Sequence, residues 1–555
     1  MDERDDRGEL TRRELIGAAA GSAALAGAAP LLGQAPAGQA AGGAPAPPHP
    51  GTRPFELSGL GLAELRRGLE SGRFTSQRLV ELYLGRIEAV DRGAAGTHAV
   101  AEVNPEALAL AATLDAERRA GKVRGPLHGL PILIKDNIGT ADGMETTAGS
   151  LALVGARPAK DAYLVGRLRA AGALLLGKTN LSEWANFRST RSSSGWSGRG
   201  GQVHNPHALD RNPCGSSSGS AVAPAADLCA AAVGTETDGS ITCPAAMNGV
   251  VGLKPTVGLV SRTGVIPISH SQDTAGPMGR TVADVAILLG GLTGTDLADP
   301  ATAESAGRAA ADYASGLDAR GLAGARLGVV RAFFGWHPEI ERQAEEVLGV
   351  LRAAGATLVD PVELPNANDL DPNEFEVLLY EFKHDLNSYL AALPERGQPR
   401  SLAALIDYNL AHAEREMPWF GQELFEQSQA KGPLTEEAYQ KALETSRRLS
   451  RVEGIDALLA AQKLDALVCP TLGPAYLTDW VNGDHYGGSC TSPSAIAGYP
   501  HLTVPAGFVL GLPWGLSFLG PAWSEARLLR YGHAFELAAG ARRAPAFLST
   551  LPFEV

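Results

Sequence analysis

The sequence is poor in aromatic residues and in cysteine. Phenylalanine, tryptophan and tyrosine make up 6% of the 555 residues, whereas glycine alone occurs 66 times. Small residues let helices pack closely on a sheet, so this composition favours helix–sheet packing over a β-sandwich. The five cysteines include no CxxC pair and no Cys/His ligand spacing. We therefore expect neither a structural zinc site nor a disulfide framework.

Clusters of basic residues are also missing. The chain has 48 Lys and Arg against 61 Asp and Glu, which gives a formal net charge of −13. Because contacts to phosphate need clustered Lys and Arg, we expect no nucleic-acid partner and no binding to anionic membranes. The remaining composition, with 45% hydrophobic and 20% charged residues, is that of a globular protein with a large core.

The first forty residues have the features of an export signal. An apolar run of small residues at 15–29 is shorter than the roughly 20 residues that a membrane-spanning helix takes. It follows Arg12 and Arg13, in a stretch too acidic for an ordinary secretory leader. The pattern resembles a twin-arginine signal. We predict an export signal at 1–40, a Pro/Gly linker at 41–54 and one folded domain at 55–555. A disordered Ala/Gly/Pro extension is the alternative.

An exported chain would be periplasmic or extracellular, with no stable membrane association once its signal has been removed. Candidate cleavage sites with small residues fall near positions 35–40.

The long domain alternates helical and strand patterns. Helices are predicted at 57–90 with Ser76 as an N-cap, and at 105–120, 161–171, 220–232, 338–354 and over most of 374–461. Strands are predicted at 130–135, 173–176, 329–330, 357–359, 467–469 and 502–504. This alternation indicates a single large α/β domain.

Two motif matches are rejected on physical grounds. Residues 172–179 fit the phosphate-loop pattern, but 173–176 are strand-like, and a sheet would use the N–H groups that phosphate needs. Residues 215–219 fit the nucleophile-elbow pattern, but a turn-rich loop precedes them where that elbow needs a strand. We predict neither nucleotide binding through Lys178 nor a Ser-His-Asp triad through Ser217.

Three other segments carry residues suited to catalysis. Lys135 closes an apolar strand, and a lysine that is desolvated there could be neutral near pH 7 and act as a base. A surface lysine or a pair with Asp136 is the alternative. The second segment, 213–220, is rich in serine. In the third, 234–244, Gly239 beside Ser240 allows a sharp turn that exposes backbone N–H groups to an oxyanion.

Together these segments resemble the amidase signature family. That family has a GLP-hydrophobic-KD segment, a GGSSGGS-like loop and a G-T-D-x-G-G-S-I-x-x-P-A core, and its two serines are separated as Ser216 and Ser240 are here, by 24 positions. Further segments that match the family lie at 147–150, 177–183, 249–255, 272–277 and 496–507. The resemblance runs from about residue 57 to residue 547. It implies a single α/β domain with a mixed, twisted β-sheet flanked by helices.

The resemblance also implies the chemistry. Ser240 would be the nucleophile, Ser216 a bridging serine on a cis peptide, and Lys135 the base of a Ser–cis-Ser–Lys triad. An acyl-enzyme at Ser240 would react with water, without metal or cofactor. His128 is a rival base, but we predict a turn histidine because the relay needs no imidazole. The oxyanion would be held by the backbone N–H groups of Thr237, Asp238, Gly239 and Ser240.

The sequence departs from the family at two glycine positions. Cys214 and Asp238 stand where the family usually has glycine. The sequence around these two positions, together with residues 186–189, resembles the bacterial peptide amidase branch. That branch removes ammonia from C-terminally amidated peptides without cutting internal peptide bonds. It disfavours a subunit of a tRNA-dependent amidotransferase. We expect the Asp238 carboxylate to point away from the oxyanion. Residues 480–485 and the loop near Trp196 are candidate walls of a substrate funnel, with surface aromatics as the alternative.

The resulting hypothesis is an exported serine amidase for short peptide amides or small-molecule amides. One alternative is an amidase or esterase for small aryl or aliphatic compounds. An alternative of another class is a non-catalytic binding protein with the same fold.

Overall fold

The computed structural model describes residues 49–552 apart from 311 and 368. The predicted export signal and most of the predicted linker lie outside the described residues. Of the linker, Pro50–Thr52 form a short 3-10 helix. No helix among the described residues is long and apolar enough to cross a membrane.

Within the described residues, eleven strands form one mixed sheet in the order β1-β3-β2-β6-β8-β7-β12-β13-β11-β9-β10. β2 pairs in parallel with β3 and β6, whereas β6 pairs antiparallel with β8. The strands are β1 Val100–Val103, β2 Pro131–Lys135, β3 Leu174–Thr179, β6 Ala231–Glu236, β7 Val251–Lys254, β8 Thr274–Gly279, β9 Arg326–Val330, β10 Thr357–Val362, β11 Ala466–Pro470, β12 His501–Val509 and β13 Leu512–Leu519.

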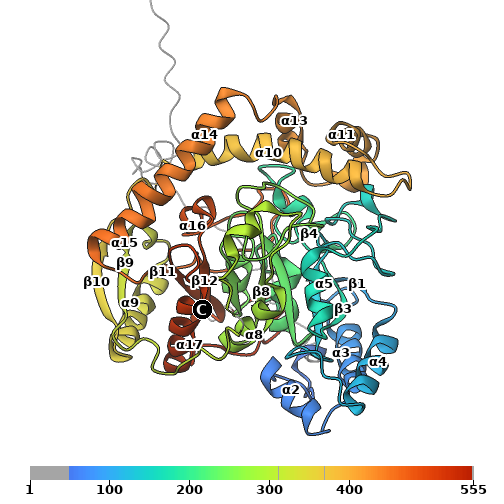
Figure 1. The fold of residues 1–555 in the computed structure, drawn as a ribbon, viewed down its shortest axis with the longest axis horizontal. Coiled ribbons are helices and arrows are strands. Elements are labelled where there is room, and N and C mark those ends of the chain that lie inside the picture. The colour runs from blue at the N-terminus through green and yellow to red at the C-terminus, as the bar shows by residue number, and fades with distance from the viewer. Residues whose placement is uncertain (1–48, 311, 368, 553–555) are drawn as a thin grey trace, which may run out of the picture. The chain divides into compact units, whose positions relative to one another are not determined.

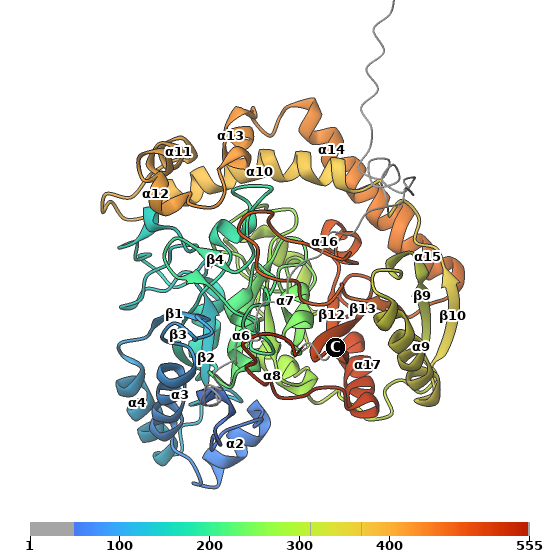
Figure 2. The ribbon, with the colours of Figure 1, turned by 180° about the vertical axis from the view of Figure 1, so that it is seen from behind.

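Helices flank this sheet. In Figures 1 and 2, α3 and α4 lie at the end with β1 and β3, α9 lies by β9 and β10, and α10 lies alongside α13 and α14. The helices are α2 Leu62–Glu70, α3 Ser76–Val90, α4 Ala107–Arg119, α5 Tyr163–Ala170, α6 Ser218–Ala225, α7 Thr242–Met247, α8 Val282–Leu292, α9 Pro338–Ala353, α10 Asp371–Ala392, α11 Leu402–Ala411, α12 Ala413–Glu416, α13 Glu423–Ala430, α14 Glu437–Arg447, α15 Asp456–Gln462, α16 Ser492–Ala497 and α17 Glu525–Ala539.

The predicted α/β class and single large domain are confirmed, and two local predictions are wrong. Thr75, not Ser76, caps α3, because its side chain accepts a hydrogen bond from Arg78 N while Ser76 is already helical. The predicted helix at 220–232 ends at Ala225. Asp227 then turns the chain with φ 59°, and the alanines from Ala231 enter β6.

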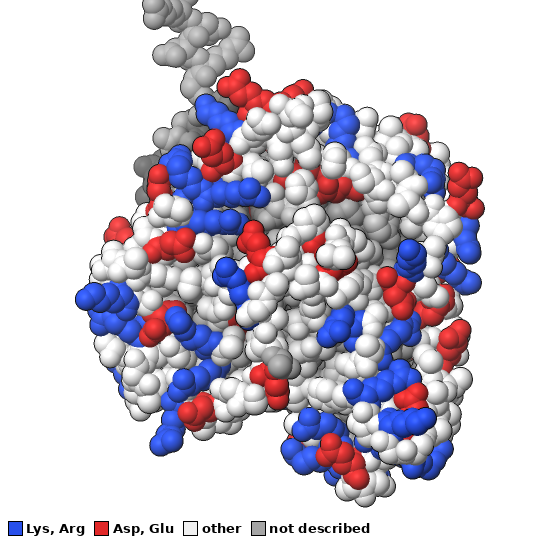
Figure 3. Space-filling view, viewed as in Figure 1, with Lys and Arg blue, Asp and Glu red and all other residues white. Residues whose placement is uncertain are grey.

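The segment that matches the phosphate loop is a buried strand, as expected. β3 includes Lys178, whose Nζ donates to Ile138 O at 2.6 Å and Thr146 Oγ1 at 2.9 Å. The backbone N–H groups of β3 face neighbouring strands, so this segment is not a loop whose N–H groups could bind phosphate. All five cysteines lie among the described residues and are free and buried. On the face in Figure 3, acidic and basic side chains are interspersed.

Candidate active site

The three segments that carry the predicted catalytic residues meet at one edge of the sheet. β2 ends at Lys135, and its parallel neighbour β6 ends at Glu236, directly before residues 237–240. The carboxyl ends of neighbouring parallel strands lie at the same edge, where α/β proteins place their ligands. Ser216 lies just before α6, and Ser217 N donates to Ser240 O at 3.0 Å, which joins the two serine loops.

Lys135 is fully buried and faces the bridging serine position. Its Nζ donates to Ser216 Oγ at 2.7 Å, to Thr235 Oγ1 at 2.9 Å and to Thr235 O at 3.3 Å. Burial lowers the pKa of Lys135 from 10.5 to about 7, against the opposing charges of nearby carboxylates. The alternative of a surface lysine, or one paired with Asp136, is wrong: Asp136 instead accepts from Arg199 Nη1 at 3.0 Å.

The two serines occupy different environments. Ser216 is fully buried, whereas Ser240 is 8% exposed. The Gly215–Ser216 peptide bond is cis, the conformation that the resemblance implied for this position. Ser217, the serine of the rejected elbow, donates from Oγ to Thr235 O at 2.9 Å and accepts from Thr235 N at 3.1 Å. Its hydroxyl therefore ties α6 to β6.

Residues 237–240, called here the oxyanion stretch, leave a run of backbone donors without protein acceptors. The N–H groups of these four residues donate no hydrogen bond to another described residue, whereas Ile241 N and Thr242 N both donate to Glu236 Oε2. Gly239 has φ +74°, and a Cβ there would lie 3.0 Å from Cys243 Sγ. Glycine is therefore the residue that fits this turn without backbone strain.

The Asp238 carboxylate is held by α16. Its Oδ2 accepts from Ser492 Oγ at 2.6 Å, so the side chain is directed toward that helix. Burial raises the pKa of Asp238 to about 6. A carboxyl with this pKa is still about nine-tenths ionised at pH 7, so its direction toward Ser492, rather than protonation, agrees with the expectation that it points away from the oxyanion.

His128 is a turn histidine. It is buried, Nδ1 accepts from Arg124 N at 3.2 Å, and Nε2 lies 3.0 Å from Leu114 O. Burial lowers its pKa. Both ring nitrogens are thus used by backbone atoms, and neither contacts a serine of the site.

The two candidate wall tryptophans differ. Trp196 is 6% exposed and packs edge-on against Phe420, so its side chain is buried, and the role of its loop as a funnel wall stays a prediction. Trp480 is 42% exposed and stacks on Trp419 with ring centroids 4.5 Å apart. Its Nε1 donates to Gln202 Oε1 at 3.2 Å.

Sequence reasoning missed several residues that support the site. Thr235 receives hydrogen bonds from both Lys135 and Asn137 Nδ2, the latter at 2.9 Å. Asp273 accepts from Thr237 Oγ1 at 2.6 Å, and burial raises its pKa to about 6. Asn137 and Asp273 both stand in segments that resemble family motifs, which was the available signal. Thr235 could be found only from its position on β6.

Comparison with known proteins identifies the family of this chain. The sequence matches the Amidase family over residues 78–529. It is 42% identical over 504 residues to a probable amidase of Arabidopsis thaliana, covering 89% of this chain and 93% of that protein.

Two solved structures are similar throughout. One is native peptide amidase from Stenotrophomonas maltophilia, with 53% identity, TM-score 0.85, and 89% of this chain and 100% of that chain covered. The other is a peptide amidase in complex with the competitive inhibitor chymostatin, with 53% identity, TM-score 0.86, and 88% and 100% covered. With a match over most of its length, this chain belongs to the amidase signature family and is an amidase similar to the bacterial peptide amidases.

Proposed function

We propose that this amidase releases ammonia from the C-terminal amide of short peptides through an acyl-enzyme on Ser240. The observation that carries the proposal is the 2.7 Å contact between Lys135 Nζ and Ser216 Oγ in a fully buried setting. A base with a pKa near 7 is suited to proton transfer at neutral pH. The similarity to peptide amidases supports the peptide substrate.

The proposed proton relay begins at the contact between Lys135 Nζ and Ser216 Oγ. Neutral Lys135 accepts the Ser216 proton while Ser216 accepts the Ser240 proton, and Ser240 Oγ forms a bond to the amide carbon. The carbonyl oxygen becomes an oxyanion and accepts from the N–H groups of the oxyanion stretch. When the C–N bond breaks, the same relay returns the proton to the leaving nitrogen as ammonia. Water then attacks the ester, the relay takes its proton, and Ser240 leaves with that proton while the peptide acid departs.

The test is ammonia release from a short peptide amide, with the unamidated peptide as a control. We expect ammonia from the amide only, intact internal peptide bonds, and loss of nearly all activity in Ser240→Ala and Lys135→Ala. Ser217→Ala is the matched control, because its hydroxyl is used in a structural contact. Activity confined to small aryl or aliphatic amides or esters would contradict the peptide assignment. Full activity of Ser240→Ala would contradict the assigned nucleophile.

We also propose that residues 1–40 direct export to the periplasm or cell exterior. The basis is the Arg12-Arg13 pair before a short apolar run. Replacing both arginines by lysine should leave the enzyme in the cytoplasmic fraction, and unchanged export of that variant would contradict the proposal.

A further inference from the structure

A short segment beside the site contacts both the oxyanion stretch and helix α10. Residues 269–273, called here the clasp segment, directly precede β8. The first residue of β8, Thr274, pairs with Glu236, the last residue of β6. This pairing places the clasp segment next to residues 237–240.

On one side the clasp segment fixes Thr237. Thr237 Oγ1 donates to Asp273 Oδ1 at 2.6 Å, and Gln272 Nε2 approaches Thr237 O at 3.4 Å. The second oxygen of Asp273 accepts from Ile268 N at 2.8 Å and Ser269 N at 2.9 Å. The hydroxyl and carbonyl of Thr237 are therefore both tied to the clasp segment, at the first residue of the oxyanion stretch.

On the other side the clasp segment binds a buried carboxylate of α10. Glu381 is fully buried, and its two oxygens accept from Ser269 Oγ at 2.5 Å, Ser271 Oγ at 2.6 Å and Ser271 N at 3.0 Å. Tyr439 OH adds a further donor at 2.7 Å, and His270 Nε2 lies 3.3 Å away. A buried carboxylate with this many donors is held in one orientation.

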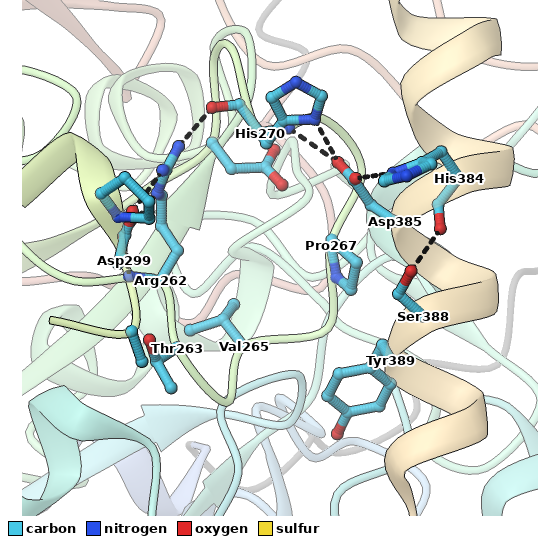
Figure 4. Close-up of a pocket in the computed structure, with 13 residues that line it drawn as sticks. Arg262, Thr263, Val265, Pro267, His270, Asp299, His384, Asp385, Ser388 and Tyr389 are labelled. Carbon is cyan, nitrogen blue, oxygen red and sulfur yellow. Dashed lines mark hydrogen bonds and ion pairs between the residues drawn. The ribbon is translucent and has the colours of Figure 1, made fainter. Parts of the chain in front are cut away.

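Two more acids of α10 complete the contact. His270 donates from its backbone N to Asp385 Oδ2 at 3.0 Å, and its Nδ1 lies 2.8 Å from the same oxygen. Figure 4 shows the His270 ring directed at Asp385 on the helix. Gln272 Nε2 donates to Glu374 Oε1 at 2.7 Å. Glu374, Glu381 and Asp385 are separated by seven and four positions, so they share one face of α10.

We propose that α10 positions the oxyanion stretch through the clasp segment, and that Glu381 and Asp385 are positioning residues for the reaction. This inference rests on the proposed function in one respect, that residues 237–240 bind the oxyanion. Their N–H groups have no acceptor among the described residues, so their direction depends on what holds the loop. Preorganised donors stabilise a transition state only while their geometry is maintained.

The test compares Glu381→Gln with Glu376→Gln. Glu376 also lies on α10 and also loses one charge, but it pairs with Lys431 at 2.6 Å and does not contact the clasp segment. We expect Glu381→Gln to lower kcat about tenfold or more, since small displacements of catalytic groups have effects of this size, with KM changed less than twofold. Glu376→Gln should match the wild type. Asp385→Asn serves as a second clasp variant, with the same direction of effect.

Inhibition by a short peptide aldehyde separates positioning from simple loss of folded enzyme. The aldehyde adduct places an oxygen where the oxyanion forms, so its Ki should weaken by about the same factor as kcat/KM falls. A purely structural role would lower the titrated fraction of active sites and leave Ki unchanged. The apparent pKa near 7 in the pH profile of kcat/KM should be unchanged in Glu381→Gln, because Lys135 keeps its contacts.

Hydrogen exchange over residues 232–245 tests the inference without any substrate. We expect faster exchange in Glu381→Gln than in Glu376→Gln, because Ile241 N and Thr242 N directly follow the oxyanion stretch that the clasp segment supports. Wild-type exchange in Glu381→Gln would overturn the inference, as would unchanged kcat and Ki for whichever amide the wild type hydrolyses. A wild type that hydrolyses only small amides would contradict the peptide assignment alone.

Discussion

Raising the pH through neutrality should switch the enzyme on by deprotonating Lys135. At about 1.36 kcal/mol for each pKa unit, the fall from 10.5 to about 7 means that the site disfavours the ammonium form by a net amount of about 5 kcal/mol, with burial as the largest cause. With the ordinary pKa, about one lysine in 3,000 would be neutral at pH 7, whereas about half would be neutral with the lowered value. The buried position of Lys135 thus raises the fraction of competent base by about three orders of magnitude.

The direction of the pH dependence follows from which protonation state of Lys135 acts as the base. The neutral amine accepts the Ser216 proton, so activity is absent at low pH, rises through the pKa, and levels off above it. The assay is kcat/KM for ammonia release from a peptide amide between pH 5 and pH 9.5, since this ratio reports the free enzyme. We expect one rising limb with an apparent pKa of about 7.

The matched control is Lys254→Met, because burial also lowers the pKa of Lys254, to about 8, on β7. The rising limb should keep its pKa in this variant. In Thr235→Val it should move to lower pH, because the ammonium form loses the acceptor at 2.9 Å. A flat profile over this range, a limb near pH 10, or a limb that moves in Lys254→Met would refute the reasoning.

Three further outcomes are expected. His128→Gln should keep kcat within a few-fold of the wild-type value and lower the free energy of unfolding by about 1 kcal/mol, because only hydrogen bonds to backbone atoms are lost. Steady-state kinetics and urea unfolding check this. A folded but inactive variant would restore His128 as a rival base. Gly239→Ala should lower kcat more than it raises KM, because a Cβ at φ +74° would lie 3.0 Å from Cys243 Sγ; steady-state kinetics with wild-type values would contradict this. Arg188→Met should lower the free energy of unfolding by about 3–5 kcal/mol in chemical denaturation, because it removes the buried guanidinium that pairs with Glu183 and donates to Glu416 O.

Some of the fold could be predicted because the signals are local. The apolar runs of β2 and β3 and the amphipathic periods of α3, α4 and α9 are properties of short windows, and each was found within a few residues of its observed bounds. Alanine misled the prediction at 231–232. Its high helix propensity was overridden where β6 lies between β2 and β8.

For the candidate site, the sequence by itself determined the segments that hold Lys135, Ser216 and Ser240, and the family that they resemble. Only the tertiary structure decided that Lys135 is desolvated and faces Ser216, 81 positions away, while its neighbour Asp136 binds Arg199. It also decided that α10 binds the clasp segment across more than a hundred positions. The physical reason is that burial and partner choice depend on which strands and helices pack together, and a local pattern of residue types does not specify this.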